Sequence, residues 1–165
     1  MQYTMKELLL IMPQIGKVDW ISRRQVKRGA VESVDSINVS IESGLEGDHY
    51  GKQGGKRMIT LIQAEHIAVV ESILGKSVDP KLLRRNIVVS GINLLALKDQ
   101  TFQIGEAVLK MTGLCHPCSR METNLGAGGY NAMRGHGGVT TTVIQGGMIR
   151  LGDEVKLLLA EENSE

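Results

Sequence analysis

The chain is poor in aromatic residues, in cysteine and in proline, and each shortage excludes a class of protein. Only five aromatic residues occur among 165, so a nucleic-acid surface built on stacked bases is not expected. Two cysteines do not make a disulfide framework, and three prolines exclude a proline-rich linker. No apolar run approaches the roughly 20 residues of a membrane-spanning helix.

Net charge is also scarce, because 19 basic and 18 acidic side chains leave a formal charge of +1. Such a balance gives no broad attraction to nucleic acid or to an anionic membrane, so any anion site has to be a local patch. The first 13 residues lack a basic leader and a small-residue cleavage site. We therefore expect a cytoplasmic, reduced protein with neither nucleic acid nor a membrane as partner.

Glycine is the residue in excess, at 20 of 165 or about 12% against roughly 7% in an average protein. With 42% hydrophobic and 22% charged residues, the chain has an ordinary globular composition and the length of one domain, 1–165. Glycines in this number favour many short strands joined by tight turns and bulges.

The residue pattern predicts a mainly β chain of mixed α/β class. A helix is expected over 64–74, capped by Gly75, and two shorter ones over 80–84 and 117–124. Glycine-rich loops are expected at 43–56 and 126–138. Strands are predicted at 18–21, 31–39, 58–62, 87–89, 107–112, 139–144, 149–151 and 154–159, the last two as a hairpin. Because strands and helices do not alternate regularly, a mixed β-barrel is favoured over a doubly wound sheet.

The two cysteines, Cys115 and Cys118, are three residues apart and allow several interpretations. A C-x-x-C pair is typical of thioredoxin-like redox sites, but those require an early βαβ unit. A structural zinc site usually needs a second pair of ligands, which the scattered histidines do not supply. Two small buried core cysteines and a single reactive thiolate are the remaining possibilities.

The case for a single thiolate is strongest at Cys118. If Pro117 is the first helical residue, Cys118 lies in the first turn, close to unpaired backbone N–H groups and to Arg120. Both effects favour the thiolate, so the sequence predicts that Cys118 is the reactive thiol.

A basic pair, Arg84 and Arg85, precedes an apolar strand and Asn86. It is either a solvated helix end, where arginine suits the helix dipole, or a grip for a phosphate or carboxylate. The glycine-rich loops match neither the Walker nor the dinucleotide-binding pattern, although their N–H groups can form anion-binding nests.

Taken in order, these segments resemble the MOSC domain family, named for the C-terminal domain of molybdenum cofactor sulfurase. The resemblance extends over about 16–158 and is most recognisable towards the end. The segments that carry it are Gly44-Leu45-Glu46-Gly47-Asp48-His49, Arg57 to Ile62, Arg85 to Gly91, Gly105 to Leu109, Pro117-Cys118-Ser119-Arg120-Met121-Glu122, and Gly137-Gly138-Val139 with Val143 to Val155.

The resemblance implies a β-barrel with a few peripheral helices that binds the molybdenum cofactor, a pterin with a phosphate, or passes sulfur to it. The family's cysteine, which ligates molybdenum or carries a persulfide, corresponds to Cys118, whereas Cys115 lies outside the pattern. The residues that correspond to the cofactor-binding positions are Arg57, Arg85, Asn86, Arg120, Gly137 and Gly138.

Two functions follow from the resemblance. The first is a molybdenum-dependent reductase of N-hydroxylated or related N-oxygenated compounds, with Cys118 as the molybdenum ligand. The second is a sulfur-carrier module that holds a persulfide on Cys118 for a cofactor or metal–sulfur cluster held by a partner. The chain contains no pyridoxal phosphate domain and no iron–sulfur cysteines, so an external sulfur or electron donor is expected in either case.

Overall fold

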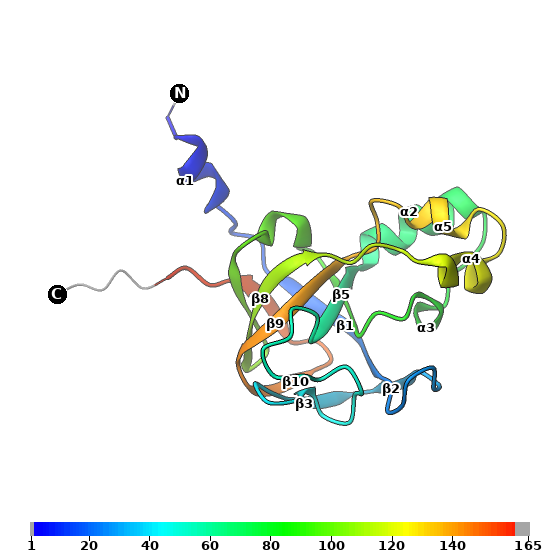
Figure 1. Ribbon diagram of the computed structural model, residues 1–165. Coiled ribbons are helices and arrows are strands. Elements are labelled where there is room, and N and C mark those ends of the chain that lie inside the picture. Colours follow the sequence, from blue (N-terminus) through cyan, green and yellow to red (C-terminus); the bar gives the residue numbers. More distant parts are fainter. Residues whose placement is uncertain (1, 161–165) are drawn as a thin grey trace.

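The computed structural model describes residues 2–160, which form a β-barrel with most of its helices gathered on one side (Figure 1). The strands of the barrel and of its extension are β1 (Gly16–Arg23), β2 (Glu32–Val34), β5 (Ile59–Gln63), β6 (Ile87–Ser90), β7 (Thr101–Ile104), β8 (Ala107–Leu114), β9 (Val139–Gln145) and β11 (Glu154–Leu157). A second, three-stranded sheet contains β3 (Ser36–Ser40), β4 (Gly44–Leu45) and β10 (Gly147–Arg150). The helical segments are α1 (Met5–Leu9), α2 (Ala64–Leu74), α3 (Pro80–Leu83), the 3-10 helix η1 (Leu94–Leu97), α4 (Ser119–Leu125) and α5 (Gly129–Met133).

Seven strands close the barrel in the order β11-β7-β8-β9-β5-β6-β1, and β1 returns to β11. The closing pair is antiparallel, with Gly16 opposite Val155 and Lys17 opposite Glu154. β5 and β6 run parallel, which requires a crossover connection, and α2 and α3 lie in that connection. The predicted mainly β barrel with few helices is therefore confirmed.

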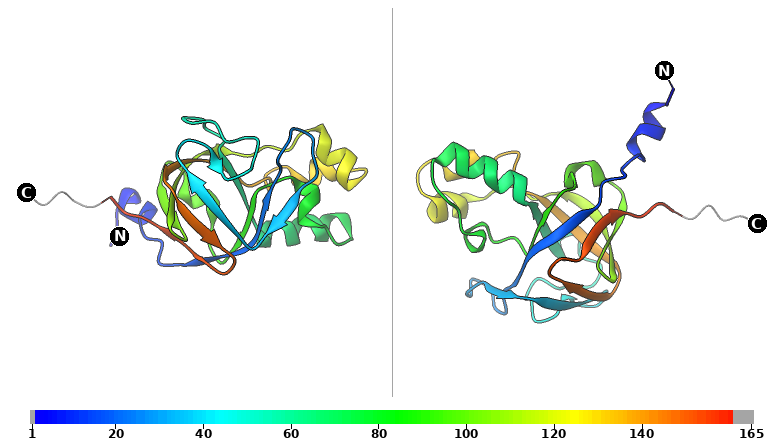
Figure 2. Two further views of the ribbon diagram at one scale, coloured as in Figure 1. Left: turned by 90° about the horizontal axis from the view of Figure 1, so that it is seen from below. Right: turned by 180° about the vertical axis from the view of Figure 1, so that it is seen from behind.

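The second sheet shares the hydrophobic core of the barrel. Ile37 and Val39 of β3 and Ile149 of β10 are buried in the same cluster as Phe102 and Leu109 of the barrel. Two views at right angles show this sheet lying across one end of the barrel (Figure 2). The burial of these side chains from both sheets closes that end against water.

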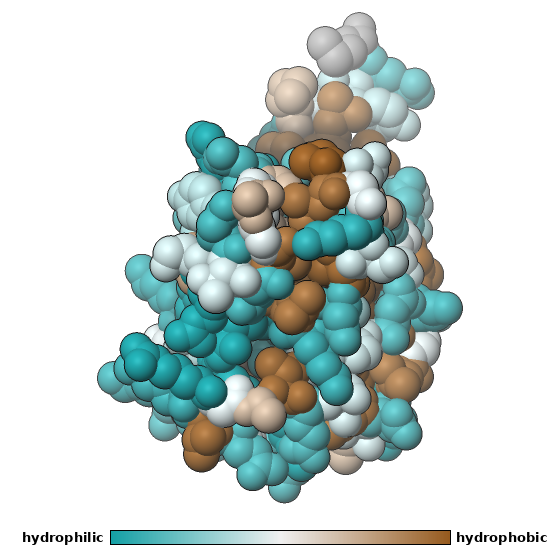
Figure 3. Space-filling model, turned by 90° about the vertical axis from the view of Figure 1, so that its right-hand side faces the viewer, coloured by the Kyte–Doolittle hydropathy of each residue, from teal (hydrophilic) through white to brown (hydrophobic). Residues whose placement is uncertain are grey.

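Helices α2 to α5 pack on one side of the barrel around a second core (Figure 1). Ile62 of β5 and Val88 of β6 face Val70 of α2, Met121 of α4 and Met133 of α5 in one buried cluster. By contrast, α1 buries no side chain and projects from the body together with exposed apolar residues (Figures 1 and 3). Four predicted site residues lie next to these helices: Arg85 and Asn86 between α3 and β6, and Cys118 and Arg120 at the start of α4.

The helix predicted over 64–74 is confirmed at both ends. Gly75 follows it in the left-handed conformation at φ 69°, which glycine adopts without a Cβ penalty. Helix α3 also begins at Pro80, as predicted. Asp79 caps it, because its carboxylate accepts a hydrogen bond from the Lys81 N–H at 3.0 Å.

Two predictions about strands are wrong: one predicted strand is divided between two sheets, and one predicted hairpin does not form. The strand expected over 31–39 breaks at Asp35, whose carbonyl accepts from Leu151 N–H at 3.0 Å, so β2 stays beside β1 while β3 joins the second sheet. The expected terminal hairpin does not form, because β10 pairs with β3 and β11 with β7 and β1. Strand pairing here is decided by tertiary packing, which local alternation does not encode.

The glycine-rich segments contain more structure than predicted. β4 lies within 43–56, and α5 lies within 126–138. The Glu122 carboxylate of α4 accepts hydrogen bonds from the N–H groups of Gly128 at 2.8 Å and Tyr130 at 2.9 Å. A helix of five residues is too short to be stable alone, so this cap from a neighbouring helix explains why α5 forms.

The close approach of Gly138 to β5 explains one glycine of the second loop. Its φ is 86°, and a Cβ at this position would collide with the backbone carbonyl of Leu61. Gly135, three residues earlier, has φ 79° but open space around the position of a Cβ.

This pair predicts a difference in stability. Gly135→Ala incurs only the left-handed penalty of about 1 kcal/mol, whereas Gly138→Ala must also displace a barrel strand and should lower the free energy of unfolding by about 3 kcal/mol or more. Urea denaturation of both variants measures the difference. Equal losses would show that Gly138 is needed only for its backbone conformation.

Candidate functional site

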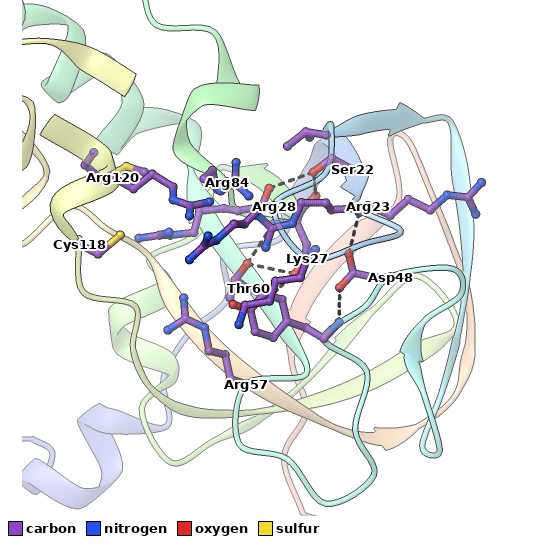
Figure 4. Close-up of a pocket in the computed structure, with 16 residues that line it drawn as sticks. Ser22, Arg23, Lys27, Arg28, Asp48, Arg57, Thr60, Arg84, Cys118 and Arg120 are labelled. Carbon is purple, nitrogen blue, oxygen red and sulfur yellow. Dashed lines mark hydrogen bonds between the residues drawn. The ribbon is translucent and has the colours of Figure 1, made fainter. Parts of the chain in front are cut away.

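A cleft of about 260 Å³ opens where the barrel meets the helices. Its walls come from the end of β1 and the β1–β2 loop, the turn before β5, the α3–β6 junction and the start of α4 (Figure 4). Five predicted site residues, distant in sequence, all line it: Arg57, Arg85, Asn86, Cys118 and Arg120. Gly137 and Gly138 do not line the cleft, and they instead pack against the Cys115 and Leu61 carbonyls.

The two cysteines occupy different environments. Cys115 is 1% exposed in the core, whereas Cys118 is exposed and its sulfur points into the cleft (Figure 4). Cys118 is the N-cap residue of α4 rather than part of its first turn, and its side chain makes no capping hydrogen bond. The thiol of Cys118 is therefore available to a ligand, and that of Cys115 is not.

Arg85 joins three segments of the site from within. It is 5% exposed, and its guanidinium donates to three backbone carbonyls: Gly137 at 2.7 Å, Leu83 at 3.1 Å and Cys115 at 3.2 Å. Burial lowers the pKa of the Arg85 guanidinium from its usual value, and the neighbouring Cys115 opposes that shift. The residue predicted as an anion grip is thus largely committed to holding the α3 end, the segment after β8 and the loop before β9 together.

Asn86 is held just as firmly at the start of β6. Its side-chain oxygen accepts from the N–H of Thr60 at 3.0 Å and from the Thr60 hydroxyl at 3.1 Å, and its own N–H donates to that hydroxyl at 3.0 Å. The Ser22 hydroxyl closes the network on the Arg85 and Asn86 carbonyls. With its oxygen occupied, the Asn86 amide presents its NH₂ group as the remaining donor.

The cleft is strongly cationic although the whole chain is nearly neutral. Among residues 2–160, Asp48 is the one acidic residue that lines it, and that carboxylate already accepts the N–H groups of Arg24 at 2.8 Å and Tyr50 at 3.3 Å. The basic residues that line the cleft are Arg23, Arg24, Lys27, Arg28, Arg57, Arg84, Arg85 and Arg120. Charge of one sign concentrated in a concave site attracts anions.

Four of these cations, Arg23, Arg24, Lys27 and Arg28, were missed by sequence reasoning. They lie together in the stretch 23–28, and this local basic cluster is the signal that could have identified them. Arg23 is neutralised by Glu32, with Nε and Oε2 3.1 Å apart, and the Arg24 guanidinium lies 5.6 Å from the centre of the Tyr50 ring.

Five other cations of the cleft, namely Lys27, Arg28, Arg57, Arg84 and Arg120, have donors free to bind a ligand. Within residues 2–160, no hydrogen bond or ion pair joins another residue to the side chains of Lys27, Arg28, Arg57 or Arg120, and the Nη2 atom of Arg84 is buried without a partner. A buried donor without a partner is costly, and an anion in the cleft would relieve that cost. Over the same residues, no group of three or more His, Cys, Asp or Glu side chains could hold a metal ion.

Comparison with known proteins agrees with this architecture. A family model described as MOSC domain matches residues 46–156. The YuaD protein of Bacillus subtilis has a similar structure, with a TM-score of 0.73 and 22% identity over 86% of this chain and 94% of that one. YiiM of Escherichia coli gives 0.66 and 19% over 87% and 70%, and YiiM of Geobacillus stearothermophilus gives 0.65 and 18% over 90% and 77%. A search of curated proteins finds no significant match.

The three carbonyl contacts of Arg85 predict that its shape matters more than its charge. Arg85→Lys keeps the charge but cannot reach all three carbonyls, so the free energy of unfolding should fall by about 3 kcal/mol. Arg57→Lys, the same change at an exposed cleft residue, should alter it by less than about 0.5 kcal/mol. Chemical denaturation of the two variants checks this, and equal stability would contradict the structural role of Arg85.

Proposed function

The chain belongs to the MOSC domain family, which is associated with molybdenum cofactor binding and sulfur transfer, and we propose that the cationic cleft binds the molybdenum cofactor with Cys118 as a ligand of the metal. The observation that carries the proposal is the exposed Cys118 thiol at the wall of a cleft that also contains Arg57 and Arg120, neither of which has an ion-pair partner among residues 2–160. A thiolate is a soft ligand suited to such a metal, and the arginines suit the phosphate of the pterin.

The residues of the cleft fit this group. Cys118 supplies an exposed thiol as sulfur donor, and the unpartnered Nη2 of Arg84 supplies a buried donor for an anion. The positive charges of Arg57 and Arg120 attract the phosphate. Asn86, oriented by Thr60, offers its NH₂ group to the ligand.

The activity we propose is reduction of N-hydroxylated or related N-oxygenated compounds. The cofactor, when bound, supplies two-electron removal of an oxygen atom from the substrate. The protein binds and orients the cofactor and the substrate, and its fixed charges stabilise the anionic groups. Electrons come from an external donor, since the chain offers no second redox group beyond its two cysteines.

Sulfur transfer is the second candidate, and the exposure of Cys118 favours it. A persulfide on this thiol would be open to a partner protein, and the nearby positive charge would stabilise its anionic form. The two functions differ in what the cleft carries: molybdenum in the first, and sulfane sulfur on cysteine without metal in the second.

Loading of the full chain in a molybdenum-replete, cofactor-producing host separates these possibilities. Wild-type protein should retain close to one molybdenum per chain, and Cys118→Ala should lose at least about nine-tenths of it because the protein's metal ligand is gone. Cys115→Ala, which removes a buried thiol away from the cleft, should retain most of it. Elemental analysis and cyanolysis measure the metal and the sulfane sulfur.

Full molybdenum retention by Cys118→Ala would contradict the assigned ligand. Sulfane sulfur without molybdenum in the wild type, lost in Cys118→Ala, would replace the reductase with the carrier. The absence of both cargoes from the wild-type chain would contradict both functions.

A further inference from the structure

The β1–β2 loop brings two cations into the cleft on the side opposite α4. Lys27 and Arg28 are exposed residues of this loop, and both line the cleft. The close-up shows Cys118 and Arg120 entering from α4 on one side and Lys27 and Arg28 from the loop on the other (Figure 4). Within residues 2–160, neither loop side chain has an ion-pair partner.

The backbone of the cleft is strained where two of its arginines emerge. In the described part of the chain, three non-glycine residues have positive φ, and two of them line the cleft: Arg28 at 62° and Arg84 at 60°. Glycine would adopt this conformation without penalty. Arg84 takes this conformation as the left-handed C-cap that ends α3. Arg28 takes it within the loop, where an arginine is retained although glycine would fit more easily.

The charge in the cleft exceeds what one phosphate needs. A phosphate monoester carries about −1.5 to −2 charges near neutral pH, so two cations balance it. Among the described residues, seven of the eight cations that line the cleft have no ion-pair partner. Arg24 lies against the Tyr50 ring and Arg85 donates to three backbone carbonyls, which leaves five for a ligand: Lys27, Arg28, Arg57, Arg84 and Arg120. After one phosphate, about three positive charges are left, enough for a second anionic group.

We propose that Lys27 and Arg28 form a second anion subsite, which binds a phosphate or carboxylate group of the substrate. This inference rests on the proposed function, because it assigns the first phosphate to the cofactor and the side near Cys118 to the reacting group. The substrate class is then a small N-oxygenated compound that carries a phosphate or a carboxylate remote from the nitrogen. Neutral analogues lack the group that the loop binds.

Titration of the ¹⁵N-labelled full chain with inorganic phosphate at low salt tests the subsite by NMR. We expect saturable shifts of backbone amides at 24–31, separate from those at 118–121. Arg28→Gly should weaken the response at 24–31 by about tenfold or more, since a charge-assisted hydrogen bond is lost, and should leave the response at 118–121 unchanged. Lys27→Gln should also weaken the loop response. Acetate in a parallel titration shows whether a carboxylate suffices.

Asp99→Gly is the matched control for strain. Asp99 is the third non-glycine residue with positive φ, at 58°, and it does not line the cleft. Both glycine variants relieve the same backbone conformation, so neither should lower the melting temperature, but only Arg28→Gly should lose phosphate affinity. Equal phosphate affinity of Arg28→Gly and Asp99→Gly would overturn the proposal.

The same titration of molybdenum-loaded protein separates the two sources of phosphate. If the loop binds the substrate, amides at 24–31 still respond after loading, because the cofactor occupies the other part of the cleft. A loop that responds only before loading binds the cofactor's own phosphate, and the second subsite is then wrong. A chain that carries no molybdenum but shows the loop response retains the anion subsite and overturns the proposed function instead.

Discussion

The site depends on one buried guanidinium. Arg85 connects the end of α3, the segment after β8 and the loop before β9 through three backbone carbonyls. These three segments are far apart in the sequence. The carbonyl that Arg85 contacts at Cys115 lies three residues before the exposed Cys118. A buried charge is tolerated only when its donors are satisfied, so this arginine fixes the backbone on which the reactive thiol is presented.

The other cations of the cleft differ from Arg85 in their partners and in their backbone conformation. Arg85 is satisfied by the protein itself, whereas Arg28 and Arg84 have strained backbones, and Arg84 keeps a buried Nη2 atom without a partner. A surrounding barrel with a continuous core stabilises such local defects. The molecule therefore separates the cations that build the cleft from those that are left for a ligand, and this separation is the physical basis of the proposed anion binding.

Local signals in the sequence predicted local structure well and connections poorly. The helix at 64–74 and its Gly75 cap follow from apolar spacing and from glycine's freedom at positive φ. The break at Asp35 and the separation of β10 from β11 depend on which sheet each strand joins, and α5 depends on a cap from Glu122. At the site, the ordered motifs located Arg57, Arg85, Asn86, Cys118 and Arg120. They missed Lys27 and Arg28, which line the cleft only because of the way the β1–β2 loop folds.

The central claim is that Cys118 and the cationic cleft hold the molybdenum cofactor. The most direct test is a crystal structure of loaded protein with anomalous diffraction data collected on either side of the molybdenum absorption edge. We expect one molybdenum peak in the cleft, within bonding distance of the Cys118 sulfur and flanked by density for a phosphate against the arginines. A molybdenum peak elsewhere on the chain, or a loaded protein whose cleft contains only water, would contradict it.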